Sequence, residues 1–274
     1  SIMLTNLMNK YSDLISQVET ELLLSSIFRC SREDIYINNM VIDREIEALY
    51  DSLIERRLSG EPLQYITGSS QFMGLDFLVT RDVFIPRPET EDLVNEVLLC
   101  KKLNPKILDL CTGCGNIAVS LAHLIDQTGI VATDISGPAL EIAYKNSVIH
   151  KLDERIRFYK GDLFAALPLD KKYKFDIIVC NPPYIKDCEI EGLQKELGSE
   201  PRIALDGGPT GLEFYRRIRR SCSDYLEKDG SLFLEIGYGQ IEAVKEIFAR
   251  DIYKIRKVTK DFRGIERVIW IGLS

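Results

Sequence analysis

Beyond Lys106 the sequence shows a regular alternation of short apolar runs with helical stretches. Each run is four to six residues long and rich in Ile, Val, Leu and Phe. Strands joined by helices form a parallel sheet covered on both faces, because a parallel connection needs a crossover of a dozen or more residues. The predicted strands cover residues 107–110, 130–134, 156–159, 175–180 and 231–236.

Two further strand-like runs, residues 253–258 and 267–271, follow near the end of the sequence. At the tightest count only Asp261 to Glu266 separate them, which is too short for a parallel crossover, so we expect an antiparallel pair. The sequence therefore predicts an α/β fold: a Rossmann-like domain with a seven-stranded, mostly parallel sheet.

The N-terminal part shows helical spacing and no strand-like run. Apolar residues recur at three- and four-residue intervals over 14–23 and again over 46–58, after the N-cap candidate Asp43. Ser31 and Asp34 mark a short helix between these two stretches. We expect a small helical domain without a catalytic constellation, whose exposed face contacts a partner.

The connection between the two parts reads as structured. Gly60 and Pro62 break the last helix, and residues 71–79 are typical of a short hairpin that turns near Gly74. The predicted division is a helical bundle over 1–68, a β-hairpin linker over 69–85 and the sheet domain over 86–274.

Composition and net charge disfavour several classes of protein. A net charge of −7 and a pI near 5.1 disfavour stable nucleic-acid binding, which needs clustered Lys and Arg. No run of 18 apolar residues and no signal peptide is visible, so we expect no membrane association. Seven cysteines without a framework spacing fit free thiols in a reducing, cytoplasmic compartment.

The predicted strand 175–180 ends in Asn181-Pro182-Pro183-Tyr184. Asn offers an amide acceptor, and two prolines remove two N–H groups, so the corner presents oxygens to an incoming NH2 group. Tyr184 adds a flat face for a planar amide or base. A proline-rich strand end could carry these residues by chance, so their meaning depends on whether a cofactor site lies beside them.

A glycine loop, Cys111-Thr112-Gly113-Cys114-Gly115, follows the first strand, and Asp134 ends the second. Glycines allow a close approach to a ligand, and an acid about 20 residues later is typical of ribose recognition. Gly113-x-Gly115-x-x-Ala118 also satisfies the dinucleotide pattern, so a nicotinamide or flavin enzyme is one alternative.

Two features favour S-adenosyl-L-methionine as the cofactor, with S-adenosyl-L-homocysteine as product. Asp109, followed by this loop, suits a zwitterion with a cationic sulfur better than a pyrophosphate, and Asn-Pro-Pro-Tyr has no role in hydride transfer. After the third strand, Asp162 is placed to meet the adenine amino group, with Leu163 flanking the ring. The prediction is a Rossmann-like S-adenosylmethionine-dependent methyltransferase domain.

The pair Cys111-x-x-Cys114 could instead be a redox motif or half of a metal site. Zinc needs two further ligands, and the chain has only His123 and His150, both in helical context. We therefore predict no metal.

Taken together, these segments resemble the bacterial protein-(glutamine-N5) methyltransferases that modify peptide-chain release factors, the PrmC or HemK family. The resemblance covers nearly the whole chain. The Asn-Pro-Pro-Tyr motif is shared with amino-methyltransferases of DNA and RNA, whereas the Pro-Arg-Pro-Glu-Thr-Glu and Ala-Leu-Asp-Gly-Gly segments are highly specific. The matching segments are 62–68 with Phe72, 85–91, 111–115, 181–185, 200–208 with Gly211 and Leu212, and 234–237.

The resemblance implies a role for each matching site residue. It places the ribose on Asp134 and the adenine beside Leu163, and it lets Asn181 touch both cofactor and substrate. The cofactor loop would be Cys111, Thr112, Gly113, Cys114 and Gly115. The substrate would contact Asn181, Pro182, Pro183 and Tyr184. The catalytic residues would be Asn181, Pro182 and Tyr184.

Two positions depart from the family pattern. Cys111 stands where Gly is usual, and Cys is small enough for the turn if its φ is negative. Leu163 stands where an aromatic is common, which keeps apolar contact but loses stacking and predicts weaker cofactor binding.

The implied substrate is the glutamine of the Gly-Gly-Gln loop in class I release factors, with the helical bundle binding the release factor, in support of translation termination. We expect a monomer. Two alternatives remain open at this point: an amino-methyltransferase acting on adenine or guanine, which would need a basic target-recognition region, and a non-catalytic partner-binding protein built on the same fold.

Overall fold

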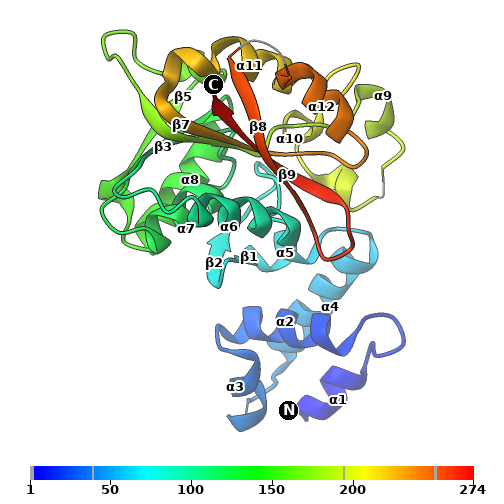
Figure 1. The fold of residues 1–274 in the computed structure, drawn as a ribbon. Coiled ribbons are helices and arrows are strands. Elements are labelled where there is room, and N and C mark those ends of the chain that lie inside the picture. Colours follow the sequence, from blue (N-terminus) through cyan, green and yellow to red (C-terminus); the bar gives the residue numbers. More distant parts are fainter. Residues whose placement is uncertain (1–2, 39, 194, 250–251) are drawn as a thin grey trace. The chain divides into compact units, whose positions relative to one another are not determined.

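The computed structural model describes residues 3–38, 40–193, 195–249 and 252–274. The chain divides into two compact units, which are Ser1–Ser69 with Gln194–Ser199, and Ser70–Leu193 with Glu200–Ser274. We call them the helical unit and the sheet unit (Figure 1). The predicted linker, residues 69–85, falls within the sheet unit from Ser70 onward.

The helical unit packs short helices around one apolar core, to which Leu23, Tyr50 and Ile54 contribute. Local sequence sets its helix starts: the Ser31 and Asp34 side chains form a capping box, and Asp43 accepts a hydrogen bond from the Ile46 amide. The helices are α1 (Leu4–Asn9), α2 (Gln17–Phe28), α3 (Arg32–Ile37), α4 (Arg44–Leu58) and α5 (Leu63–Thr67).

The helix predicted over 14–23 begins later than its apolar spacing suggests. Ser16 caps α2 in a capping box with Glu19, so Leu14 precedes the helix and is 61% exposed. Val18 is also largely exposed, whereas Leu23 and Leu24 are buried. A local cap therefore decides the boundary where the hydrophobic spacing does not.

The sheet unit opens with a hairpin of β1 (Ser69–Phe72) and β2 (Leu75–Leu78). Phe72 and Phe77 are buried in the core to which α6 (Glu91–Leu99) and α7 (Asn116–Leu124) also contribute. The remaining elements are a 3-10 turn η1 (Pro88–Thr90), α6 (Glu91–Leu99), β3 (Lys106–Leu110), α7 (Asn116–Leu124), β4 (Gly129–Asp134), α8 (Gly137–Ile149), η2 (Asp153–Arg155), β5 (Ile156–Lys160), η3 (Leu163–Ala166), β6 (Phe175–Cys180), α9 (Asp187–Ile190), α10 (Arg202–Leu205), α11 (Glu213–Tyr225), β7 (Leu226–Glu235), α12 (Ile241–Phe248), β8 (Tyr253–Lys260) and β9 (Glu266–Leu273).

The predicted seven-stranded sheet is confirmed, in the order β5-β4-β3-β6-β7-β9-β8. Strands β3 to β7 are parallel, and β9 is antiparallel to both β7 and β8. The chain runs outward from β3 through β4 to β5 and then returns to place β6 on the other side of β3. The order of the strands therefore reverses between β3 and β6, where ligands bind at the carboxyl ends of open α/β sheets.

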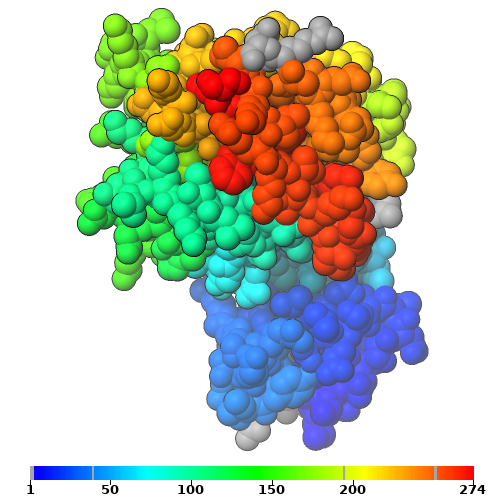
Figure 2. Space-filling model, in the orientation of Figure 1, coloured from blue at the N-terminus to red at the C-terminus, as the bar shows by residue number. Residues whose placement is uncertain are grey.

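Both faces of the sheet are covered, with α6 to α8 on one side and α11 and α12 on the other (Figure 1). Strand β6 shows the resulting period of two: Ile177 and Val179 belong to the core under α6 and α7, and Ile178 and Cys180 to the core under α11 and α12. In the space-filling view the C-terminal segments, orange and red, form a continuous part of the surface (Figure 2). No helix within the described ranges is long and apolar enough to cross a membrane.

Candidate active site

The glycine loop and the Asn-Pro-Pro-Tyr corner come together at the reversal point of the sheet. Leu110 of β3 pairs with Cys180 of β6, so residues 111–115 and 181–184 leave the sheet side by side. Thr112 donates its N–H to the Thr133 carbonyl at 2.9 Å, which holds the loop against the end of β4. The fold thus gathers the residues that the sequence predicts for cofactor and substrate.

The loop turns through three left-handed residues, Cys111 (φ 58°), Gly113 (φ 56°) and Gly115 (φ 81°). At Gly115 a side chain would also lie 3.1 Å from the Ala143 Cβ atom, a tight contact that glycine avoids. The condition that φ is negative at Cys111 is not met. Because the chain must turn sharply as it leaves β3, this cysteine adopts a conformation that favours glycine.

This strain predicts that Cys111→Gly stabilises the protein. A left-handed conformation costs an L-residue about 1 kcal/mol or more, part of which glycine returns as unfolded-state entropy. We expect the free energy of unfolding to rise by about 0.5–1 kcal/mol in urea denaturation followed by circular dichroism. Cys111→Val, which places a branched Cβ in the same conformation, should lower it, and equal stability of the two variants would contradict the strain.

Two acids lie near the carboxyl ends of β3 and β4, Asp109 one residue before the end of β3 and Asp134 at the end of β4. Asp109 is fully buried; the Thr112 hydroxyl donates to one of its oxygens at 2.6 Å, and its other oxygen has no partner in the described part of the chain. Burial raises the pKa of Asp109 to about 7. Asp134 accepts the backbone N–H groups of Gly113 and Ser136, each at 2.9 Å, and burial raises its pKa as well. Both carboxylates keep acceptor capacity for a ligand.

The third predicted acid, Asp162, lies where β5 ends and accepts a hydrogen bond from Arg217 at 2.6 Å. Its side chain is nearly half exposed. Leu163, the predicted adenine neighbour, is buried and has a left-handed φ of 50°. The ion pair with α11 was not visible in the sequence, because 55 residues separate the two partners.

The Asn-Pro-Pro-Tyr corner presents two oxygens. Asn181 donates its side-chain NH2 to the Thr90 hydroxyl at 3.4 Å. Among the described residues neither the Asn181 side-chain oxygen nor the Pro182 carbonyl accepts a hydrogen bond. Thr90 therefore turns the amide so that its oxygen remains available beside the Pro182 carbonyl.

Hydrogen bonds hold both the side chain and the backbone of Tyr184. Its hydroxyl donates to the Glu235 carboxylate at 3.2 Å, and its carbonyl accepts from the Gln240 amide at 2.9 Å. The ring is mostly buried against the core under α11 and α12. Gly207 lies so close that a side chain there would come within 2.8 Å of the Tyr184 Cα atom, so the Gly207 segment supports the corner from behind.

Glu235 was not predicted as a site residue from the sequence, although it lies within the matching segment 234–237. Its carboxylate is fully buried at the end of β7; one oxygen accepts from Tyr184, and the other has no partner within the described ranges. Burial raises its pKa to about 7, while the Thr90 and Tyr184 hydroxyls oppose that rise. Thr90 thus contacts Asn181, and Glu235 contacts Tyr184. The sequence signal that could have identified Glu235 is its position as an acid at the end of a predicted apolar strand.

The raised pKa of Glu235 predicts a pH-dependent stability. The folded carboxyl holds its proton up to about pH 7, whereas the unfolded one loses it near 4.5, so the free energy of unfolding falls as pH rises between these values. The expected loss from this group is about 3 kcal/mol. Glu235→Gln should flatten the dependence between pH 5 and 8 in urea titrations, and parallel curves for the two proteins would refute the assignment.

Two further anchors were also missed. Glu200 has a buried side chain that pairs with Arg87 and accepts the Ile85 N–H at 2.8 Å. Asn146 is fully buried; its amide donates to the Cys114 carbonyl at 2.8 Å and also bonds the backbone of Leu78. The first anchor holds the segment before η1, and the second ties the cofactor loop to the hairpin.

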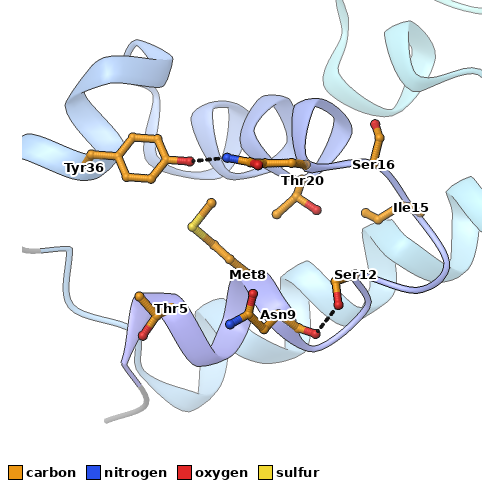
Figure 3. Close-up of a pocket in the computed structure, with 9 residues that line it drawn as sticks. Thr5, Met8, Asn9, Ser12, Ile15, Ser16, Thr20 and Tyr36 are labelled. Carbon is orange, nitrogen blue, oxygen red and sulfur yellow. Dashed lines mark hydrogen bonds between the residues drawn. The ribbon is translucent and has the colours of Figure 1, made fainter.

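A pocket of about 340 Å³ lies in the helical unit, between α1 and α2 (Figure 3). Short polar side chains such as Thr5, Ser12 and Thr20 line most of it, together with Met8 and Ile15. The Gln17 amide donates to the Tyr36 hydroxyl at its rim, at 3.3 Å. The side chains that line it are uncharged.

Two protein families match the chain. Residues 90–202 match the Methyltransferase small domain, and residues 9–68 match the PrmC N-terminal domain. A solved methyltransferase from Pyrococcus furiosus has the same fold as the sheet unit, with a TM-score of 0.55 and 18% identity over 81% of this chain and 98% of that one.

Curated relatives extend the match to nearly the whole chain. The release factor glutamine methyltransferase of Geobacter sulfurreducens is 40% identical over 93% of this chain and 88% of its own length. The enzyme of the same name from Thermodesulfovibrio yellowstonii is 39% identical over 98% and 96%. Together with the strand-end geometry, these similarities show that the chain belongs to the family of release factor glutamine methyltransferases.

Proposed function

We propose that this protein methylates the side-chain amide nitrogen of the glutamine in the Gly-Gly-Gln motif of class I peptide-chain release factors, with S-adenosylmethionine as the methyl donor. The observation that carries the proposal is the pair of unpartnered acceptors, Asn181 Oδ1 and the Pro182 carbonyl, beside the glycine loop. A primary amide has two N–H donors, which such a pair can accept.

The residues around the loop fit the cofactor of this family, whose members are S-adenosylmethionine-dependent enzymes. The unpartnered, buried oxygen of Asp109 suits a cationic group, and Asp134 has lone pairs left for ribose hydroxyls. Positive φ angles at Gly113 and Gly115 let the loop backbone approach a ligand. When bound, S-adenosylmethionine supplies an electrophilic methyl group on a cationic sulfur and leaves as S-adenosylhomocysteine.

The corner would activate a poor nucleophile. An amide nitrogen delocalises its lone pair into the carbonyl, so it attacks only when that lone pair is aimed and the developing positive charge is stabilised. Asn181 Oδ1 and the Pro182 carbonyl would accept the two amide hydrogens and supply both effects from fixed dipoles. Positioning of this kind can contribute roughly 7 kcal/mol or more. The product nitrogen releases its proton readily, so no histidine is needed.

Tyr184 would support the amide plane, with Thr90 and Glu235 as positioning residues behind it. Thr90 accepts from the Asn181 NH2 group, which fixes the direction of its oxygen, and Glu235 fixes the Tyr184 hydroxyl. Pro182 and Pro183 carry no backbone N–H group. A substrate NH2 group therefore meets acceptors without competing donors from these two residues.

The helical unit would bind the body of the release factor. Its support is the match of residues 9–68 to the PrmC N-terminal domain and the absence of an acid–base constellation in the pocket of Figure 3. The proposal includes a cytoplasmic monomer that does not bind nucleic acid stably, in keeping with the net charge of −7.

The test is methyl transfer from labelled cofactor to a purified class I release factor. A release factor with the loop glutamine changed to Glu should take up no label, and deoxyoligonucleotides and RNA run in parallel should stay unlabelled. Undiminished labelling of the Glu variant would exclude this glutamine as the substrate. Labelled nucleic acid would instead indicate an amino-methyltransferase of bases.

A further inference from the structure

Two thiols meet at the reversal point of the sheet. Because Leu110 pairs with Cys180, Cys111 is the diagonal neighbour of Cys180, and strand spacing places the two Cα atoms about 6 Å apart. A regular strand would turn the two side chains to opposite faces. The left-handed φ of 58° at Cys111 breaks that alternation, and its side chain packs against the same core to which Cys180 belongs.

The other cysteine of the loop is not part of this pair. Cys114 is buried, and its sulfur lies 3.6 Å from the Asn116 side-chain oxygen. Burial raises the pKa of Cys114 to about 12, so it stays a neutral thiol. The Cys111-x-x-Cys114 spacing suggests a redox motif, but Cys180, and not Cys114, belongs to the core against which Cys111 packs.

We propose that Cys111 and Cys180 form a reversible disulfide under peroxide, and that this bond switches the active site off. The switching effect rests on the proposed function; the bond itself does not. A disulfide needs Cα atoms roughly 4.4–6.8 Å apart, which the diagonal position satisfies. Cys111 is partly exposed and Cys180 fully buried, so an oxidant reaches Cys111 first.

The reaction balances with one hydroperoxide per disulfide. The Cys111 thiolate attacks a peroxide oxygen and breaks the O–O bond, which gives a sulfenic acid and, for hydrogen peroxide, one water after proton uptake. The Cys180 sulfur then attacks the Cys111 sulfur, the S–O bond breaks, and the leaving hydroxide takes the Cys180 proton as a second water. Two thiols are oxidised by two electrons, and the peroxide is reduced by two.

The disulfide would affect both the cofactor loop and the Asn-Pro-Pro-Tyr corner. Cys111 begins the cofactor loop, and Cys180 directly precedes Asn181. A bridge draws these two strand ends together and fixes the loop whose Gly113 N–H bonds Asp134. The thiols of Cys30, Cys100 and Cys188 are exposed or half-exposed and lie elsewhere in the chain, so they are replaced in the test to prevent their own oxidation from affecting the result.

The experiment uses the full chain with Cys30, Cys100 and Cys188 changed to Ser, treated with a small molar excess of hydrogen peroxide. Peptide mass spectrometry should find a cross-linked peptide pair joining Cys111 to Cys180, and release factor methylation should fall at least tenfold. A dithiol reductant should restore both. Cys180→Ala in the same background should lose the cross-link and reduce the reversible inactivation to less than about twofold.

Cys222→Ala is the matched control, since its thiol is also fully buried and burial alone raises its pKa. It should leave cross-link and inactivation as they are. A cross-link between Cys111 and Cys114, or irreversible oxidation of Cys111 alone, would overturn the proposed pair. A Cys111–Cys180 cross-link with unchanged methylation would overturn the switch but keep the bond. If the reduced protein shows no methylation at all, the proposed function fails, and mass spectrometry still decides the disulfide.

Discussion

Asn181→Ala should lower kcat for release factor methylation by about 10³-fold, because it removes an acceptor that stabilises charge developing on the amide nitrogen. This corresponds to roughly 4 kcal/mol of transition-state stabilisation. The Kd of S-adenosylmethionine should rise less than about tenfold, since the loop and its acids remain. Single-turnover kinetics with saturating cofactor and isothermal calorimetry measure the two effects separately.

Thr90→Val is the matched control for this prediction. It removes the hydroxyl that accepts from the Asn181 NH2 group but keeps the Asn181 amide itself. We expect a loss of about tenfold in kcat, because the amide still accepts but is less firmly aimed. Full activity of Asn181→Ala would refute the role of the corner, and an equal loss in both variants would mean that orientation, not the acceptor, carries the effect.

The fold was predictable because its signals are local. In β6, Ile177 to Cys180 are all buried, with alternate residues on the two faces, and this needs a sheet covered on both sides. The short link after β8 excludes a parallel crossover, and β8 and β9 do pair antiparallel. Because parallel strands share one carboxyl edge, the sequence alone is enough to predict that Gly113 and Asn181 lie near each other.

The details of the site depend on contacts that no local pattern encodes. The Asn181 amide is aimed by Thr90, 91 residues earlier, and Tyr184 is held by Glu235, 51 residues later. The positive φ of Cys111 follows from the turn that the fold imposes after β3, not from the residue type, so the sequence did not determine its sign. Residue types thus identify the chemistry, while long-range neighbours decide which atom points where.

Cofactor binding and catalysis can be tested separately. Substitution of Asp134 tests cofactor binding, and substitution of Asn181 tests catalysis. Asp134→Ala should raise the Kd of S-adenosylmethionine about 100-fold, close to 2.7 kcal/mol. The change removes the acceptor for Gly113 and Ser136 at 2.9 Å, loosening the loop, and it removes the carboxylate proposed to hold the ribose. At saturating cofactor kcat should fall less than about threefold.

Asp162→Ala is the control for Asp134, since both acids lie where neighbouring strands of the sheet end. The Asp162 side chain is nearly half exposed and already paired with Arg217, so its contribution to a ligand is screened by water. We expect its Kd for the cofactor to rise less than about tenfold. Equal weakening by the two substitutions would mean that net negative charge at this edge, rather than the buried hydrogen bonds of Asp134, holds the cofactor. If Asp134→Ala lowers kcat without changing the Kd of the cofactor, Asp134 belongs among the groups that act on the transition state.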